Sequence, residues 1–197
     1  MYQIVTREDL TPEIHLFEIM APDVAKKAQA GQFIMLMVSE TGERVPLTLA
    51  GYDVKKGTIS FAFNEVGKTT KLLGCLNEGD CIQSITGPLG KPSEIRDFGK
   101  VLCIGGGVMI APMLLQAKAF AEAGNILTSV IGARIKDLLF FEEEMKRLSS
   151  KLYVATDDGS KGHKGFVSEV LKGLIEKEYP LKIVYAIGPP LMMKATS

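Results

Sequence analysis

A glycine-rich segment in the middle of the chain has the residue types and position of a nucleotide-binding turn. It runs Gly105-Gly106-Gly107-Val108-Met109-Ile110-Ala111-Pro112, after an apolar run and before a stretch with helical periodicity. Glycines there let the phosphates of a ligand approach backbone N–H groups at the positive end of a helix. The spacing departs from G-x-G-x-x-G, because Ile110 stands where the third glycine would fall. Two interpretations stay open, a nucleotide site and a turn that only allows close packing.

A second candidate, Gly67-Lys68-Thr69-Thr70, has the residue types found at the end of a P-loop. A P-loop needs another glycine five positions earlier, and Ala62 stands there, so a P-loop is excluded. A glycine followed by two hydroxyl side chains at the start of a short helix still suits a pyrophosphate. An N-capping threonine without a ligand explains the segment equally well.

The remaining polar motifs are weaker when each is taken alone. Arg44-Val45-Pro46-Leu47-Thr48 places a cation and a hydroxyl along an extended segment that could be an ordinary edge strand. Gly188-Pro189-Pro190 predicts a turn into a helix. Thr156-Asp157-Asp158-Gly159-Ser160 predicts a solvated loop. His15 and His163 have no second ligand or nucleophile at a diagnostic spacing, so neither is assigned a catalytic role.

Composition excludes several classes of protein. Lys plus Arg and Asp plus Glu both total 23, so the basic excess of a nucleic-acid-binding protein is missing. Three cysteines without a C-x-x-C pair argue against a disulfide scaffold or a metal site within the chain, and they predict a reducing, cytoplasmic location. The polar N-terminus is not a signal peptide. The longest uncharged run, Val101 to Ala117, has 17 residues and is too short for a membrane span.

Up to about residue 97, short apolar runs of strand length alternate with turn residues. The predicted strands are Tyr2–Thr6, Glu13–Ala21, Gln32–Val38, Pro46–Ala50, Thr58–Phe63 and Cys81–Thr86, with one short helix over Thr69–Leu76. Strands of this length and spacing predict a small antiparallel barrel or sandwich.

From Lys100 onward, strands alternate with helices. The predicted strands are Val101–Ile104, Ile126–Ile131, Leu152–Thr156 and Ile183–Ile187, and the predicted helices start near Ala111, cover Asp137–Leu148 and Phe166–Glu178, and begin again at Pro190. This alternation predicts a parallel sheet with right-handed crossovers. We place the boundary so that residues 1–96 form one domain and 97–197 the other. Because Pro190–Ser197 has the pattern of a helix that has only begun, we expect the chain to be truncated at its C-terminus.

Taken together and in order, these motifs resemble the ferredoxin–NADP reductase superfamily from about residue 40 to residue 193. The matching segments are R-x-P-L-T at 44–48, G-x-x-T at 67–70, Gly87-Pro88-Leu89-Gly90, the turn ending in Ala111-Pro112, Gly132-Ala133-Arg134, and Gly188-Pro189 followed by Met192. Each motif is weak alone, whereas six in register are strong. The resemblance implies an N-terminal FAD-binding antiparallel Greek-key β-barrel and a C-terminal NAD(P)-binding α/β domain.

Within the superfamily, Val66–Thr70 and Thr156–Ser160 resemble one branch. It contains the electron-transfer subunit of dihydroorotate dehydrogenase and the small subunit of NADH-dependent ferredoxin–NADP oxidoreductase; Glu43–Thr48 and Leu138–Glu142 favour the second. The resemblance implies a subunit that moves a hydride between NAD(P)H and FAD. It would pass single electrons on to an iron–sulfur centre and a larger redox partner subunit, or to ferredoxin. Members carry a 2Fe–2S cluster on cysteines beyond the nicotinamide domain, so here a cluster is expected only in a tail beyond Ser197.

The resemblance also assigns roles to residues. Thr48 would lie near flavin N5, where the hydride is transferred. The other FAD-contacting residues would be Arg44, Pro46, Leu47, Phe63, Asn64, Gly67, Thr69 and Thr70. The dinucleotide would meet Gly106, Gly107, Ala111, Pro112, Arg134, Gly188 and Pro189, with Arg134 beside the adenosine ribose or a 2′-phosphate. Many relatives have a cysteine before the final Gly-Pro, where this chain has Ile187, so no thiol is expected beside the nicotinamide.

One departure concerns Arg44. The family usually places an arginine three residues before the hydroxyl, whereas Arg44 is four residues before Thr48 and Val45 takes the usual place. On a regular strand a one-residue shift turns a side chain to the other face. Either a bulge restores the direction, or Arg44 does not touch the FAD phosphate.

Three further questions stay open at this point. Because Arg134 is a single cation, NAD is slightly favoured over NADP. A nucleotide-binding module of this fold without a redox role is one alternative, and a self-contained reductase for a small acceptor is another.

Overall fold

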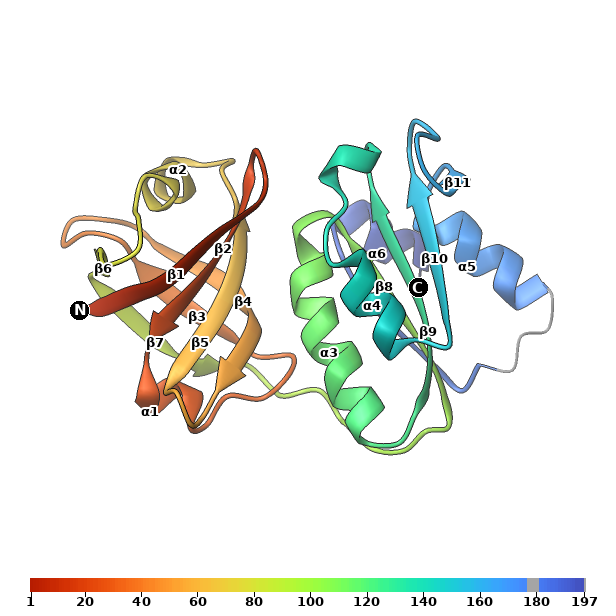
Figure 1. Ribbon diagram of the computed structural model, residues 1–197, viewed down its shortest axis with the longest axis horizontal. Helices are drawn as coiled ribbons and strands as arrows, with labels where there is room; N and C mark the ends of the chain where they lie inside the picture. The colour runs from red at the N-terminus through yellow and green to blue at the C-terminus, as the bar shows by residue number, and fades with distance from the viewer. Residues whose placement is uncertain (177–180, 197) are drawn as a thin grey trace. The chain divides into compact units, whose positions relative to one another are not determined.

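A computed structural model describes residues 1–176 and 181–196 (Figure 1). The chain divides into two compact units, Met1–Ser93 and Glu94–Ser197, which are described separately below. Within the described residues, no helix is both long and apolar enough to cross a membrane.

The first unit is an antiparallel sheet that closes on itself. Its strands are β1 (Tyr2–Thr11), β2 (Ile14–Met20), β3 (Phe33–Met37), β4 (Arg44–Asp53), β5 (Thr58–Asn64), β6 (Cys81–Ile82) and β7 (Ser84–Leu89), in the order β6-β1-β2-β5-β4-β3-β7. Only Gln83 separates the two edge strands, so one nearly continuous segment pairs with β1 at one edge and with β3 at the other. Closure removes the unpaired edges that an open sheet would expose. The predicted antiparallel barrel is confirmed.

Two short helices complete this unit, α1 (Pro22–Ala25) and α2 (Lys68–Gly74). Alternate residues of β2 and β5 point inward, and Phe17, Phe61 and Phe63 pack together in the core. The Phe17 and Phe63 rings meet edge to face with centroids 5.0 Å apart, which is a favourable aromatic geometry. β1 continues five residues beyond the predicted Tyr2–Thr6, because Arg7, Glu8 and Asp9 remain paired with β2.

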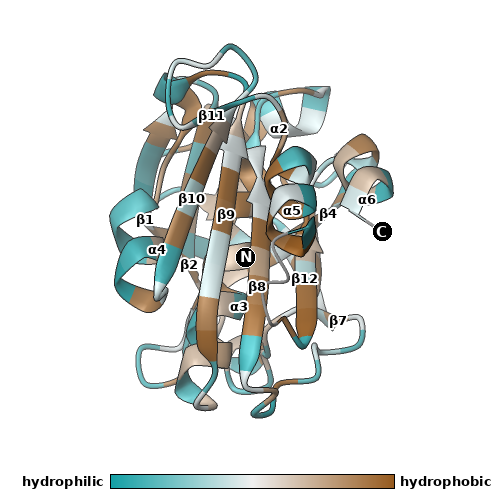
Figure 2. Cartoon of the chain, turned by 90° about the vertical axis from the view of Figure 1, so that its right-hand side faces the viewer, coloured by the Kyte–Doolittle hydropathy of each residue, from teal (hydrophilic) through white to brown (hydrophobic). Residues whose placement is uncertain are grey.

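The second unit is a parallel sheet with helices on it, as predicted. Its strands are β8 (Lys100–Gly106), β9 (Ile126–Ala133), β10 (Lys151–Thr156), β11 (His163–Lys164) and β12 (Ile183–Ile187), in the order β11-β10-β9-β8-β12. The connections contain η1 (Gly107–Met109), α3 (Ile110–Glu122), η2 (Lys136–Leu138), α4 (Glu142–Leu148), α5 (Val167–Glu176) and α6 (Pro190–Thr196). β8 and β12 are apolar along most of their length in Figure 2; β8 is buried from Val101 onward, as expected of a strand covered on both faces, whereas β12 lies at the edge of the sheet and is only partly buried.

The helix predicted over Asp137–Leu148 is shorter than expected. A 3₁₀ turn covers Lys136–Leu138, and α4 begins only at Glu142, after Phe141 has adopted a left-handed conformation with φ of 56°. Phe140 is buried in this non-helical stretch, so its apolar periodicity reflects burial of a loop rather than a helix face. The helix predicted over Phe166–Glu178 is observed as Val167–Glu176, and its last two predicted residues lie outside the described ones.

α6 is attached to the sheet through Met192. The Met192 thioether lies against two glycines at the ends of neighbouring strands: a Cβ added to Gly106 would come within 2.7 Å of Sδ, and one added to Gly188 within 2.5 Å. Met192 also packs on the cluster that includes Leu102 and Ile104. These two glycines therefore have a packing reason to lack a side chain, because Met192 fills the space.

We predict a specific energetic coupling between Gly188 and Met192. Gly188→Ala should cost about 1 kcal/mol of unfolding free energy, since the clash is with the mobile end of a methionine. In a Met192→Ala background the same change should cost much less, which gives a coupling of at least ~0.5 kcal/mol. Urea unfolding of the four proteins in the cycle measures it.

Met193→Ala provides the matched control, because this neighbouring methionine on α6 is 39% exposed and approaches neither glycine. Its effect and that of Gly188→Ala should add within about 0.5 kcal/mol. Equal coupling of Gly188 to both methionines would contradict the packing described here.

Candidate functional site

The parallel sheet has a topological switch point at β8. This strand comes first in the unit, and the next two strands, β9 and β10, extend the sheet to one side, whereas β12 pairs with β8 on the other side. In open α/β sheets, ligands bind in the crevice outside the carboxyl ends of the strands at such a point. Gly106 and Gly188 stand at the carboxyl ends of these two adjacent strands.

The turn that leaves β8 combines buried and open positions. Gly107 has φ of 57°, and a Cβ added to it would meet no atom within 4 Å. By contrast, Gly106, Ala111 and Pro112 are buried, and Ile110 is fully so. Of the predicted positions in this turn, Gly107 is the one whose backbone a ligand can approach. A turn whose backbone is open in this way suits the phosphates of a dinucleotide.

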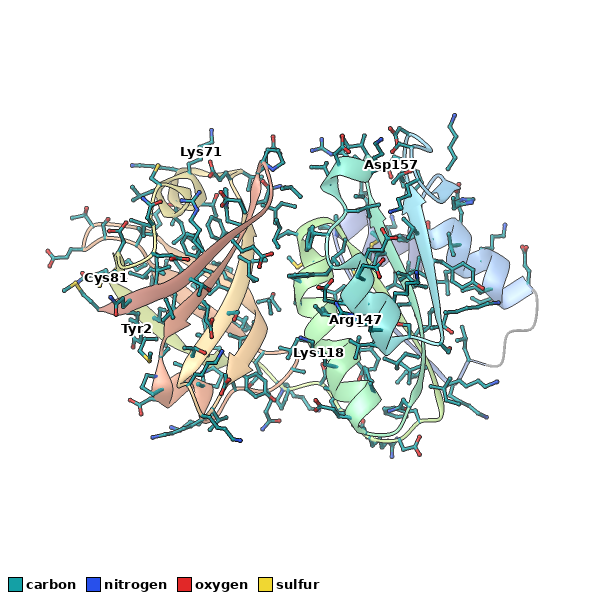
Figure 3. All side chains as sticks on the ribbon, in the orientation of Figure 1. Tyr2, Lys71, Cys81, Lys118, Arg147 and Asp157 are labelled. Carbon is teal, nitrogen blue, oxygen red and sulfur yellow. The ribbon has the colours of Figure 1, made fainter. Side chains whose placement is uncertain are left out.

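Arg134 lies at the same carboxyl edge, just after β9, and its side chain is exposed. Its carbonyl oxygen accepts a hydrogen bond from the Asp158 N–H at 3.3 Å, and the Lys136 N–H donates to Ser160 Oγ at 2.8 Å. The loop after β10 is therefore joined to the segment that carries Arg134. Figure 3 labels Asp157, which begins this loop.

The same loop is rigidified by its own polar groups. Buried Thr156 Oγ1 donates to the Lys161 carbonyl at 2.8 Å and accepts from the Lys161 N–H at 2.9 Å. The Ser160 hydroxyl and N–H donate to Asp158, and these hydrogen bonds lower the pKa of that carboxyl below its ordinary value. Asp158 is thus an ionised group near Arg134, in a segment for which sequence reasoning predicted only a solvated turn.

In the first unit, β4 settles the direction of Arg44. The β3–β4 register is regular from Arg44 to Thr48, and the irregularity in β4 lies further along, between Leu49 and Gly51. Arg44, Pro46 and Thr48 therefore share the face of the strand that points away from the buried Leu49. No bulge restores the direction that the family's spacing implies, and the four-residue spacing instead places Arg44 on the same face as Thr48.

Arg44 is exposed, and its Nη1 reaches the Thr86 hydroxyl on β7 at 3.4 Å. It therefore crosses β3 along the outer face of the barrel. A cation, a proline and a hydroxyl spaced two residues apart on one exposed face form a platform suited to a flat ring with a phosphate group attached.

Two predicted FAD residues point elsewhere. Leu47 lies on the inner face of β4, opposite the fully buried Ile34 on β3. The Phe63 ring is 2% exposed and packs between His15 and Phe17, so its side chain offers a ligand almost no surface. Asn64, the last residue of β5, is half-buried.

At the start of α2, Gly67 and Thr70 bond to each other. The Thr70 hydroxyl accepts the Gly67 N–H at 3.0 Å and donates to the Gly67 carbonyl at 3.1 Å, while Thr69 is buried. The hydroxyl of Thr70 thus serves the end of the helix itself. Space around Gly67 remains, since Thr70 Oγ1 at 3.9 Å is the one contact an added Cβ would make.

Sequence reasoning missed the surroundings of His15. Both of its ring nitrogens lie within hydrogen-bond distance of carboxylates, Asp9 and Glu65. A signal was available: with Phe17 and Ile19 on the inner face of β2, a period of two also turns His15 inward, and a buried imidazole needs partners.

The described residues contain no group of three or more His, Cys, Asp or Glu side chains suited to a metal ion. Cys75 and Cys81 are exposed, and burial raises the pKa of the Cys103 thiol to about 12. Cys103 is therefore a protonated core residue, which is neither a nucleophile nor a ligand.

Comparisons with known proteins agree with this geometry. Residues 103–197 match a family model described as the oxidoreductase NAD-binding domain. A Thermotoga maritima homologue of the electron transfer subunit of dihydroorotate dehydrogenase B (NAD(+)) is 44% identical over 192 residues, covering 98% of this chain and 67% of the relative. An uncharacterized protein of Clostridium beijerinckii is 45% identical over 207 aligned positions, covering 100% of this chain and 69% of the relative.

Solved structures give the same result. A structure reported for NADH-dependent reduced ferredoxin–NADP oxidoreductase superposes with a TM-score of 0.92 at 43% identity, covering 98% of this chain and 70% of that one. A Neisseria gonorrhoeae ferredoxin–NADP⁺ reductase shares the fold at 19% identity, with a TM-score of 0.78. The chain belongs to the ferredoxin–NADP reductase superfamily, alongside the electron-transfer subunits of oxidoreductases.

Proposed function

We propose that this chain is the FAD- and NAD(P)H-binding part of an electron-transfer subunit. The observation that carries the proposal is the open Gly107 turn at the switch point of the parallel sheet. It occurs in a chain 43% identical to a structure of NADH-dependent reduced ferredoxin–NADP oxidoreductase. A redox role is favoured over a nucleotide-binding module that has lost its activity, because the surfaces expected for both dinucleotides are retained.

On the barrel, the outer face of β4 would hold the flavin end of FAD. When bound, FAD accepts a hydride and releases electrons one at a time, which is chemistry that side chains cannot supply. The Thr48 hydroxyl would stand beside N5, and Pro46 would support the ring. Although no bulge restores the family's direction for Arg44, its guanidinium would reach a phosphate from the face that it shares with Thr48. Asn64, Gly67, Thr69 and Thr70 would contact the rest of FAD, largely through their backbone, since Thr70 Oγ1 is engaged within the cap. For Leu47 and Phe63 we propose contacts through the backbone only.

On the α/β unit, the nicotinamide dinucleotide would lie along the carboxyl edge of the sheet. The phosphates would bind at Gly107, on a turn whose shape comes from the buried Gly106, Ala111 and Pro112. The nicotinamide would lie beside Gly188 and Pro189. Arg134 would meet the adenosine ribose. Because the ionised Asp158 is bonded to that segment and would repel a 2′-phosphate, we propose NAD rather than NADP.

The further electron path lies outside these residues. An iron–sulfur centre would need ligands that the described cysteines do not provide, and we propose one only for a protein that has further cysteines in a tail after Ser197. A larger partner subunit would receive the electrons. The Thermotoga relative favours a dihydroorotate dehydrogenase as a second candidate for that partner, beside the ferredoxin–NADP oxidoreductase type.

Gly107→Ala tests the nucleotide site directly. A side chain at Gly107 would obstruct phosphate, so we expect the Kd for NADH to rise by at least about tenfold, the loss of one good charge-assisted hydrogen bond. Isothermal titration with NADH measures it, and a parallel titration with NADPH tests the preference for NAD.

Gly99→Ala is the matched control for this variant. Gly99 also has a positive φ, 87°, and open space around its Cβ, but it precedes β8 at the opposite end of the strand. Both variants carry the same backbone strain of about 1 kcal/mol. Equal NADH affinities for the two variants would contradict the site.

Arg44→Met tests the FAD platform. If Arg44 neutralises a phosphate, the Kd for FAD should rise by about 10-fold to 100-fold, as expected for a hydrogen bond to a charged group. Fluorescence titration of the apoprotein with FAD measures it. Lys55→Met, which removes an exposed cation from the turn after β4, should leave the Kd unchanged; a loss as large as that of Arg44→Met would show that only general charge matters.

A further inference from the structure

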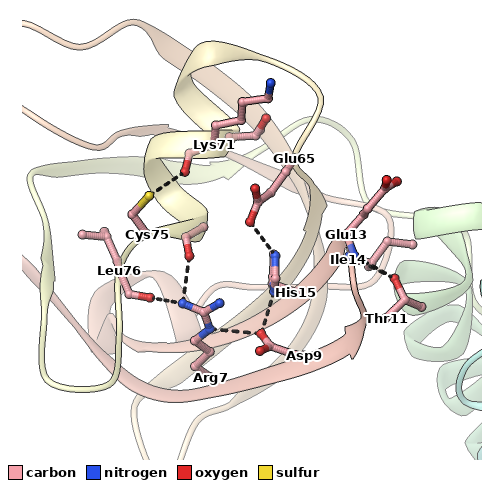
Figure 4. Close-up of polar contacts among 12 residues, drawn as sticks. Arg7, Asp9, Thr11, Glu13, Ile14, His15, Glu65, Lys71, Cys75 and Leu76 are labelled. Carbon is pink, nitrogen blue, oxygen red and sulfur yellow. Dashed lines mark hydrogen bonds and ion pairs between the residues drawn. The ribbon is translucent and has the colours of Figure 1, made fainter.

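Arg7, Asp9, His15 and Glu65 form a charged cluster beside α2 that the proposed function does not use (Figure 4). His15 is 4% exposed, with Nδ1 at 2.6 Å from Asp9 Oδ1 and Nε2 at 2.7 Å from Glu65 Oε1. Arg7 Nε donates to the same Asp9 oxygen at 3.0 Å. The guanidinium, the imidazole and the two carboxylates thus form one continuous chain of polar contacts.

The geometry makes a specific demand on the imidazole. Ionised carboxylates only accept hydrogen bonds, and a neutral imidazole has a single N–H. Both short contacts can therefore be hydrogen bonds only when both ring nitrogens of His15 carry a proton. If one proton leaves, one ring nitrogen of the nearly buried imidazole has no proton to donate to its carboxylate; Asp9 would still accept from Arg7, whereas Glu65 would lose its donor from His15.

Two members of the cluster, Arg7 and Glu65, meet the C-terminal end of α2. Arg7 Nη1 donates to the carbonyl oxygens of Gly74 at 2.8 Å and Leu76 at 2.7 Å, where the helix ends. Glu65 follows β5 and lies two residues before Gly67, and its carboxylate passes over Gly74, where a Cβ would collide with it. Backbone pairing with β2 already holds Asn64 and Glu65, and the contact between His15 and Glu65 adds a side-chain link from β2 to the segment from Asn64 to Thr70.

We infer that His15 is a positioning residue for FAD: in its doubly protonated form it fixes Glu65, and through Glu65 the Asn64–Thr70 segment, so that FAD affinity depends on the protonation of His15. The inference rests on the proposed function, in which this segment contacts FAD. His15 itself touches no cofactor. Lower pH favours a doubly protonated imidazole, so FAD should bind more tightly at low pH than at high pH.

The charged groups around His15 come from the elements that pack against it. Asp9 and Arg7 come from β1 and Glu65 from the segment after β5, while Lys71 of α2 extends away from the ring in Figure 4. Hydrogen bonds from His15 and Arg7 lower the pKa of Asp9 below its ordinary value. Asp9 therefore stays ionised across neutral and alkaline pH, and a change in affinity there does not come from this carboxyl.

The test measures the Kd of FAD for the apoprotein at about pH 6 and about pH 9, on either side of the ordinary histidine range. The wild-type Kd should rise about tenfold between them, the effect of one lost hydrogen bond to a charged group. His15→Gln has one donor and one acceptor at every pH, so it should bind FAD about tenfold more weakly at pH 6 and show little pH dependence. His163→Gln is the control, because His163 is exposed and contacts a single carboxylate, that of Glu169.

Glu65→Gln is a second variant that keeps His15 and the shape of the side chain. It should lose the same part of the pH dependence, while a cooperative urea unfolding transition of each variant, followed by circular dichroism, reports that the barrel is folded. If wild type and His15→Gln bind FAD equally with the same pH profile, the inference is overturned. If the wild type binds no FAD at either pH, the proposed function itself fails, and the inference with it.

Discussion

The position of β8 between β9 and β12 is the constraint on which the nucleotide site depends. Because the chain leaves β8 to one side and returns to its other side, helices α3 and α4 cover one face of the sheet and α5 and α6 the other (Figure 1). The connections therefore diverge at the carboxyl edge, where Met192 of α6 packs against Gly106 and Gly188. The same strand order brings the segments that carry Gly107 and Arg134 to one edge.

The glycines at that edge serve two purposes. Gly106 and Gly188 make room for Met192, which attaches α6 to the sheet, whereas Gly107 leaves its backbone open. One turn thus contains glycines that allow close packing and a glycine whose backbone is open, and the nucleotide-site interpretation concerns the open one. In the barrel, β4 likewise combines packing with exposed side chains. Its Leu47 and Leu49 point inward and pack in the barrel, whereas Arg44, Pro46 and Thr48 point outward.

Helices and strands that depend on short stretches of sequence were predicted well from those stretches. The strands of both units and the order of their types followed from apolar runs and turn residues, and the fold class followed from the change of rhythm near Lys100. The helix over Asp137–Leu148 was overestimated, because Leu139 and Phe140 are apolar for burial in a loop. Contacts between residues far apart in the sequence were not predictable. Met192 packs against Gly106 although most of the unit's sequence separates them, and His15 contacts Glu65 only because β2 pairs with β5.

We propose that one chain holds both dinucleotides and moves a hydride between them. The direct test is an anaerobic titration of the FAD-loaded protein with NADH, followed through the visible absorption of the flavin. We expect one FAD per chain and complete loss of the oxidised flavin spectrum after about one equivalent of NADH, the two-electron stoichiometry of hydride transfer. Protein that binds FAD but keeps the oxidised spectrum with both NADH and NADPH would contradict it.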